Sequence, residues 1–269
     1  MVWSVFWETL RRESRSTLLW SLGMAFFGVI TTAILPDPAG MEQIVKTLES
    51  MPPFIFQMLG VEDLSVLATP AGFIGLRFFL TAAVLLAVWA VLSGLNVITN
   101  DETRGIANMV VSLPLPRSRL LMERILASVF PALVIPLTGV AGLAVGMAVN
   151  PFAKTDLTPL VLAGLMLTPV ALVILNLTVL IGAAVPRRGV VAGIAGGFIA
   201  ISFLLKSVAG IARSDFGDAM AELSVFQHAD AVAIIRDGFP SVTALIMLAL
   251  AGAMAVSAVV FFQRRDLAA

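Results

Sequence analysis

The chain has 269 residues, of which 59% are hydrophobic and only 13% charged, and its mean hydropathy is +1.01. Soluble domains carry roughly 45–50% apolar and about 25% charged residues, so this composition excludes an ordinary water-soluble domain and indicates a membrane protein. The formal net charge of zero gives no indication of nucleic-acid binding, and the absence of cysteine excludes disulfides and thiol chemistry.

The N-terminal segment, residues 2–15, is predicted to form an amphipathic helix. Trp3, Phe6, Trp7 and Leu10 fall at helical spacing, while charged residues occupy the rest of the helical wheel. A helix of this kind lies in the membrane interface, with its tryptophans at the depth of the lipid headgroups.

Six later segments are long and apolar enough to cross a bilayer, because a spanning helix needs about 20 mostly apolar residues. They are residues 18–36, 71–99, 120–149, 158–185, 190–211 and 240–262. A secretory signal is disfavoured for the first of them, because a signal core has only about 7–15 apolar residues and no clear cleavage site follows here. The predicted fold class is an all-α membrane protein, with one transmembrane domain over residues 1–269 and six transmembrane helices.

Arginines and lysines predict the orientation, because they are enriched in cytoplasmic loops. With the N-terminus inside, the cytoplasmic side holds Arg11, Arg12, Arg15, Arg104, Arg117, Arg119, Arg124, Arg187, Arg188, Arg264 and Arg265. The opposite side holds fewer: Lys46, Lys154, Lys206, Arg213 and Arg236. The sequence therefore predicts that the N- and C-termini are both cytoplasmic.

The cytoplasmic loop after the second span contains a candidate docking helix over residues 101–113. Asn100 or Asp101 can cap its start, and acidic residues in its first turn suit the positive end of a helix. An apolar stripe follows at helical spacing, formed by Ile106, Met109, Val110 and Leu113. Such a helix suits a groove on a partner protein; the alternative is a connector that lies on the bilayer surface.

The sequence lacks the residues that catalysis or proton-driven transport would need. No acidic residue lies in the middle of a predicted span, whereas proton-driven transporters usually carry one there. There is no HExxH zinc motif, no paired carboxylate and no P-loop of the form GxxxxGK[ST], and His228 is the single histidine. We therefore expect no catalytic residue, metal or bound cofactor in this chain, and an intramembrane enzyme is disfavoured.

The same loop carries a family resemblance. The run Glu102-x-x-Gly105, then Leu113-Pro114, then Arg117-x-Arg119-Leu120-Leu121, resembles the signature loop of type-2 ABC exporter permeases. The ending Phe261-Phe262-Gln263-Arg264-Arg265-Asp266-Leu267 is also similar to that of many members. The resemblance covers the whole chain in layout, although Glu123-Arg124 stands where members often have Gly-Lys.

The resemblance implies a membrane permease subunit of an ATP-driven ABC exporter in the prokaryotic plasma (inner) membrane. It implies two permease subunits, as a homodimer or with a related partner, and two copies of a cytoplasmic ABC ATPase that bind ATP and Mg. Residues 101–113 would be the coupling helix between the second and third spans. Its ATPase-coupling residues would be Asp101, Glu102, Arg104, Gly105, Ile106, Met109, Val110 and Leu113.

The spans contain few polar residues, which favours an amphipathic, lipid-like or drug-like substrate. Arg77, Asn96 and Asn176 are the candidates for a substrate path, but snorkelling explains the arginine and interhelical hydrogen bonds explain the asparagines equally simply. Gly189, Gly193 and Gly197 recur every four residues and permit close helix packing, within one subunit or between two. The alternative function is a membrane-embedded ligand-binding or sensor subunit without export activity of its own, which would not need the docking helix.

Overall fold

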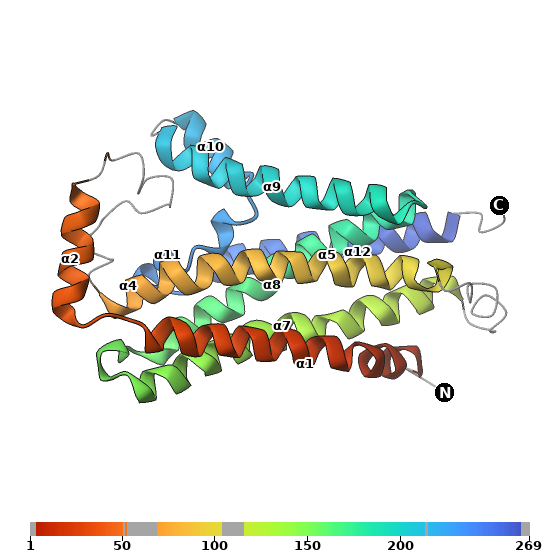
Figure 1. Ribbon diagram of the computed structural model, residues 1–269. Coiled ribbons are helices and arrows are strands. Elements are labelled where there is room, and N and C mark those ends of the chain that lie inside the picture. The colour runs from red at the N-terminus through yellow and green to blue at the C-terminus, as the bar shows by residue number, and fades with distance from the viewer. Residues whose placement is uncertain (1–3, 51, 53–68, 104–115, 213–214, 265–269) are drawn as a thin grey trace.

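The structure is a computed structural model that describes residues 4–50, 52, 69–103, 116–212 and 215–264. Within these residues the chain forms a bundle of long helices that run side by side (Figure 1). The elements are α1 (Ser4–Ala33), α2 (Pro38–Glu49), α4 (Pro70–Ile74), the π-helix η2 (Gly75–Phe79), α5 (Leu80–Thr103), α7 (Arg117–Val149), η3 (Pro151–Ala153), α8 (Leu157–Ala184), α9 (Arg188–Ala212), α10 (Asp215–Glu222), η4 (Gln227–Ala229), α11 (Ala231–Asp237) and α12 (Ser241–Arg264).

The predicted all-α fold with six candidate membrane-spanning helices is confirmed. By length and composition these are α1, the continuous run of α4, η2 and α5, and then α7, α8, α9 and α12. Helices are the natural solution in a bilayer, because every backbone polar group in them is satisfied within the same segment.

Helix α1 joins two elements that the sequence pattern separated. It runs from Ser4 to Ala33 without interruption, so residues 4–15 of the expected interfacial helix and residues 18–33 of the expected span form one helix. Nothing between them breaks a helix, and the Thr17 hydroxyl donates to the Glu13 carbonyl of the preceding turn at 2.9 Å. Figure 1 shows the first turns of α1 at an angle to the rest of the helix.

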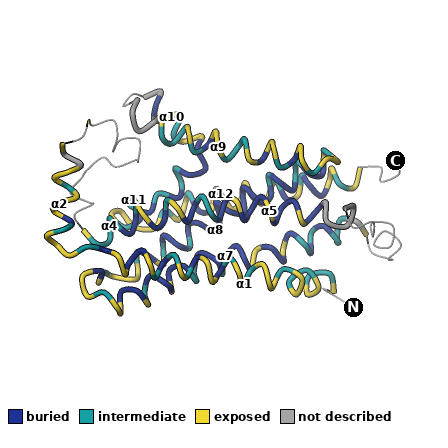
Figure 2. Tube along the Cα trace, viewed as in Figure 1, coloured by how far each residue is buried: buried dark blue, intermediate teal, exposed yellow. Residues whose placement is uncertain are grey.

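Helix α8 forms the centre of the bundle, packed against α5, α7 and α12. In its most apolar stretch 78% of the residues are buried, against 28% in α1 and α12 and 17% in α9 (Figure 2). The outward apolar faces of the outer helices are suited to lipid or to another subunit.

Helices α1 and α7 pack so closely that only glycine fits between them. A Cβ atom on Gly142 would overlap the carbonyl of Ala25, and one on Gly28 would overlap the carbonyl of Gly139. Small residues at a helix–helix contact allow the backbones to approach, and in a membrane this packing replaces the hydrophobic effect as the source of association.

The two ends of the bundle differ in charge. Helix α1 begins and α12 ends at the same end, here called the terminal end, where α5 also ends and α7 and α9 begin (Figure 1). The arginines that lie there include Arg11, Arg12, Arg15, Arg119, Arg124, Arg187, Arg188 and Arg264. The opposite, distal end holds α2, α10 and α11, together with acidic residues that include Asp37, Glu42, Asp156, Glu222, Asp230 and Asp237 (Figure 1).

Candidate functional site

The expected coupling helix falls mostly outside the described residues. Those outside are Arg104, Gly105, Ile106, Met109, Val110 and Leu113. The backbone of Asp101 and Glu102 belongs to the last turn of α5, which is helical through Thr103. A capped start of a separate helix was expected at Asn100 or Asp101; instead α5 is continuous there, because residues 95–103 contain no glycine or proline.

Both flanks of this segment lie at the terminal end, and polar contacts tie them to neighbouring helices. In α7, Glu123 is buried, with 6% of its surface exposed. Its Oε1 accepts from Arg119 Nε at 2.7 Å, and its Oε2 accepts from the backbone N–H of Phe6 in α1 at 3.1 Å. The first N–H groups of a helix have no partner within that helix. Glu123 of α7 therefore caps the start of α1.

Two arginines fasten α7 and α9 to α5 at the same end. Arg124 of α7 donates from Nη1 to the carbonyl of Val97 at 3.0 Å. Arg188 of α9 donates from Nη2 to Oδ1 of Asn96 at 3.2 Å. Asn96, a candidate for the substrate path, thus makes an interhelical hydrogen bond, as the structural alternative expected.

The three candidate residues for a substrate path do not come together. Arg77 is exposed on η2 at the distal end, whereas Asn96 is 19 positions further along the same run of helix, about 28 Å away at 1.5 Å per residue. Asn176 is buried in α8 with 4% of its surface exposed, and its Oδ1 has no hydrogen-bond partner among the described residues.

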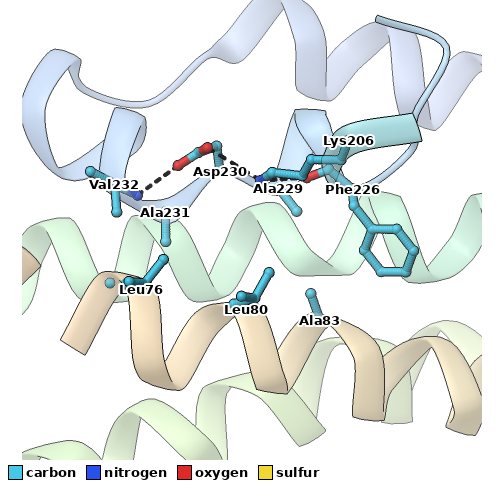
Figure 3. Close-up of a pocket in the computed structure, with 10 residues that line it drawn as sticks. Leu76, Leu80, Ala83, Lys206, Phe226, Ala229, Asp230, Ala231 and Val232 are labelled. Atoms are coloured by element: carbon cyan, nitrogen blue, oxygen red, sulfur yellow. Dashed lines mark hydrogen bonds and ion pairs between the residues drawn. The ribbon is translucent and has the colours of Figure 1, made fainter. Parts of the chain in front are cut away.

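A small cavity of about 20 Å³ lies at the distal end between η2, α9 and the segment that leads into α11 (Figure 3). It is lined by Gly75, Leu76, Leu80, Ala83, Lys206, Phe226, Ala229, Asp230, Ala231 and Val232. A space of this size holds one water molecule and is far too small for a drug-like molecule.

An ion pair closes one side of this cavity. Lys206 Nζ of α9 lies 3.2 Å from Asp230 Oδ2 and donates to the Phe226 carbonyl at 3.3 Å (Figure 3). The other oxygen of Asp230 accepts from the backbone N–H groups of Val232 and Ala233, at 3.0 and 3.2 Å, and so caps α11. One carboxylate thus connects α9 to the start of α11.

One turn before Lys206, a buried pair of serines strengthens the same connection. The Ser224 hydroxyl donates to the Ser202 carbonyl at 2.7 Å, and the Ser202 hydroxyl accepts from the Val225 N–H at 2.9 Å. Together with the ion pair, these bonds hold the segment between α10 and α11 against α9. In the sequence, Lys206 stood out only as a charge near the end of a span, and nothing local pointed to its partner.

The described residues contain no catalytic arrangement and no group of three or more His, Cys, Asp or Glu side chains that could hold a metal ion. What they do contain is two sets of interhelical contacts, one at each end of the bundle.

The chain matches the model of a known protein family. The model of the family described as "Multidrug efflux system permease Rv1217c, C-terminal domain" matches residues 8–263, and so includes nearly all of the six candidate spans. No curated protein matches the chain.

Proposed function

Because the chain belongs to the family of the multidrug efflux system permease Rv1217c, C-terminal domain, a family of ABC transporter permeases, we propose that it couples ATP hydrolysis to export across a membrane. The match over residues 8–263 is the observation that carries this proposal. The hydrolysis belongs to a separate ABC ATPase, two copies of which bind ATP and Mg, since the chain has no P-loop.

The ATPase docks at the terminal end of the bundle through residues 101–113. Two observations support this assignment: α5 and α7, which flank the segment, both have their ends there, and the arginines gather there (Figure 1). Arginine-rich ends face the cytoplasm. The distal end, with α2, α10 and α11, therefore lies on the outer side of the prokaryotic plasma membrane.

The substrate is amphipathic, lipid-like or drug-like. The cavity beside Lys206 is too small for such a substrate, and the outer helices expose many apolar side chains; both observations support a path along a surface between two permease subunits. The open face of α9 supports such pairing: a Cβ atom on Gly189, Gly193 or Gly197 would meet nothing within 4 Å, and Ile194 and Ile201 beside them are exposed.

The coupling assignment is tested in vesicles that contain the chain together with its ATPase. Met109→Asp places a charge in the apolar stripe, and an unpaired charge in an apolar interface costs several kcal/mol. We expect Met109→Asp to lower permease-stimulated ATP hydrolysis by about tenfold or more. Glu102→Asp should lower it to a smaller degree. The measurement is ATP hydrolysis together with uptake of a fluorescent cationic dye.

Asn108→Asp is the matched control, because it introduces the same residue one position away on the predicted polar face. Full hydrolysis and transport in both loop variants would show that this segment does not contact the ATPase. Dye binding without any ATP-driven movement by the wild-type complex would instead support the alternative of a ligand-binding or sensor subunit.

A further inference from the structure

Glu123 is a buried acid, and each of its two carboxylate oxygens accepts a hydrogen bond. Its side chain is 8% exposed, and its two oxygens accept from the Arg119 guanidinium of its own helix and from the Phe6 N–H of α1. Burying a carboxylate is costly unless it is paired and hydrogen-bonded. Here both conditions hold, and one of the two bonds crosses between helices that are 117 positions apart in the chain.

The start of α1 depends on this contact. Helix α1 has no acidic residue in its own first turn. The positive end of its helix dipole is therefore met by a carboxylate from another helix, a favourable charge-assisted arrangement.

The position of Glu123 along α7 connects the expected coupling segment to α1. Glu123 lies 7 positions after Pro116, the residue that precedes α7, so it is about 10 Å from the point where the segment 101–113 leads into this helix. Further along, α1 and α7 are locked by glycine contacts at Gly28 and Gly142. The two helices are therefore joined in their distal halves by packing and at the terminal end by Glu123.

We propose that Glu123 is a positioning residue for energy coupling: it fastens the start of α1 to the start of α7, so that movement of the ATPase-docking segment drives both helices together. The proposal rests on the proposed function. Without the contact, the terminal half of α1 moves independently and part of the work of ATP hydrolysis is lost.

The test uses the complete complex in vesicles and measures dye transported per ATP hydrolysed. Glu123→Ala is expected to lower this ratio at least about fivefold, the lower end of couplings measured between distant sites. If Glu123→Ala does not assemble, Glu123→Gln carries the test, because it keeps the shape and an acceptor for the Phe6 N–H; its expected ratio lies between those of wild type and Glu123→Ala. Glu8→Ala is the matched control: Glu8 pairs with Arg12 four positions later at 2.8 Å, as Glu123 pairs with Arg119, but Glu8 is exposed.

A covalent link separates positioning from a purely local role in folding. The chain contains no cysteine, so Phe6→Cys and Glu123→Cys introduce the only two thiols, and a short bifunctional thiol reagent can join them. We expect cross-linking of the double variant to restore the transported amount per ATP, and Phe6→Cys alone to be unaffected by the reagent.

The outcomes distinguish this proposal from the proposed function. Wild-type complex without ATP-driven export would overturn the proposed function. If the wild type exports and Glu123→Ala has an unchanged ratio of dye transported to ATP hydrolysed, the proposed role of Glu123 is overturned. Glu123→Gln decides the same question if the alanine variant does not assemble. A lowered ratio that cross-linking does not restore would also overturn it, because the contact would then matter only for local folding.

Discussion

Asp230 is a single side chain that serves two elements at the distal end. It caps α11 through two backbone N–H groups and pairs with Lys206 of α9, and the two charged side chains are 23% and 14% exposed. Loss of a helix cap costs about 1 kcal/mol, and a partly buried lysine left without its partner adds a similar amount. We expect Asp230→Ala to lower the free energy of unfolding by about 2 kcal/mol, measured by denaturant titration in detergent.

Asp237→Ala is the control for this prediction. Asp237 pairs with Arg236, but their side chains are 60% and 63% exposed, and exposed pairs contribute little. We expect no measurable change in the stability of this variant. Equal losses in the two variants would show that the ion pair and cap of Asp230 do not hold α11 in place.

At the residue scale, the sequence predicted which side chains are polar but not what they contact. Asn96 stood out as a polar residue in a span, yet its partner Arg188 is 92 positions away. Glu123 stood out only as a departure from a family pattern, and its partner Phe6 is 117 positions away. Periodicity and spacing in a sequence indicate which residues are neighbours within one helix. They do not indicate contacts between helices whose residues lie 92 or 117 positions apart in the chain.

At the scale of elements, the glycines of α1 and α7 determine how closely these helices pack. Gly142→Ala adds a methyl group that would overlap the Ala25 carbonyl, so the two backbones must move apart. Overpacking of this kind typically costs about 1–3 kcal/mol. We expect Gly142→Ala to lower the free energy of unfolding in detergent by that amount.

Gly23→Ala provides the comparison on the facing helix. A Cβ atom on Gly23 meets nothing within 4 Å, so the same added methyl group should leave the stability unchanged or raise it slightly. A loss in Gly23→Ala as large as that in Gly142→Ala would mean that the close α1–α7 contact at Gly142 does not explain the effect.

The sequence predicted the existence of the long helices well, and their continuity less well. A helix must contain about 20 mostly apolar residues to cross a bilayer. Runs of this length are rare in other structures, so the six long apolar segments predicted the six helices directly. The continuity of α1 from Ser4 to Ala33, across the expected boundary at residues 16–17, and the extension of α5 through Asp101 were not predicted. Changes of polarity marked the expected boundaries there, but the backbone hydrogen bonds of a helix continue until a breaking residue or a cap interrupts them.

Glycine spacing alone was equally ambiguous. The repeat at Gly189, Gly193 and Gly197 stood out in the sequence, and a Cβ atom on any of these glycines would meet nothing within 4 Å. At the glycines that pack within the subunit, such as Gly28 and Gly142, a helix distant in sequence occupies the space that a side chain would need. The arrangement of the whole bundle therefore decides which glycines contact another helix.

At the scale of the whole molecule, the open face of α9 predicts how two permease subunits pair. Gly193→Trp adds a large side chain where the subunit itself has no atom within 4 Å, so the fold of one subunit accommodates it. A second copy packed on this face would be excluded. We expect the variant to shift the dimer toward monomer by at least about tenfold in dissociation constant, measured by light scattering in detergent over a range of concentrations.

Gly252→Trp on α12 is the matched control, because a Cβ atom there also meets nothing within 4 Å. This variant should retain the oligomeric state of the wild type. If the two variants behave alike, the subunits pair through a face other than that of α9.

The packing of α1 on α7 also determines the order of assembly during synthesis. The ribosome completes α1 before α5 and α7, yet α1 packs chiefly on α7. After insertion, α1 therefore remains in lipid with its docking face unfilled until α7 arrives. Two of its hydroxyl groups are paired during this interval, because Thr31 and Thr32 donate to carbonyls of the preceding turn of the same helix. These two threonines therefore leave no unpaired hydroxyl donor in the lipid before α7 packs on α1.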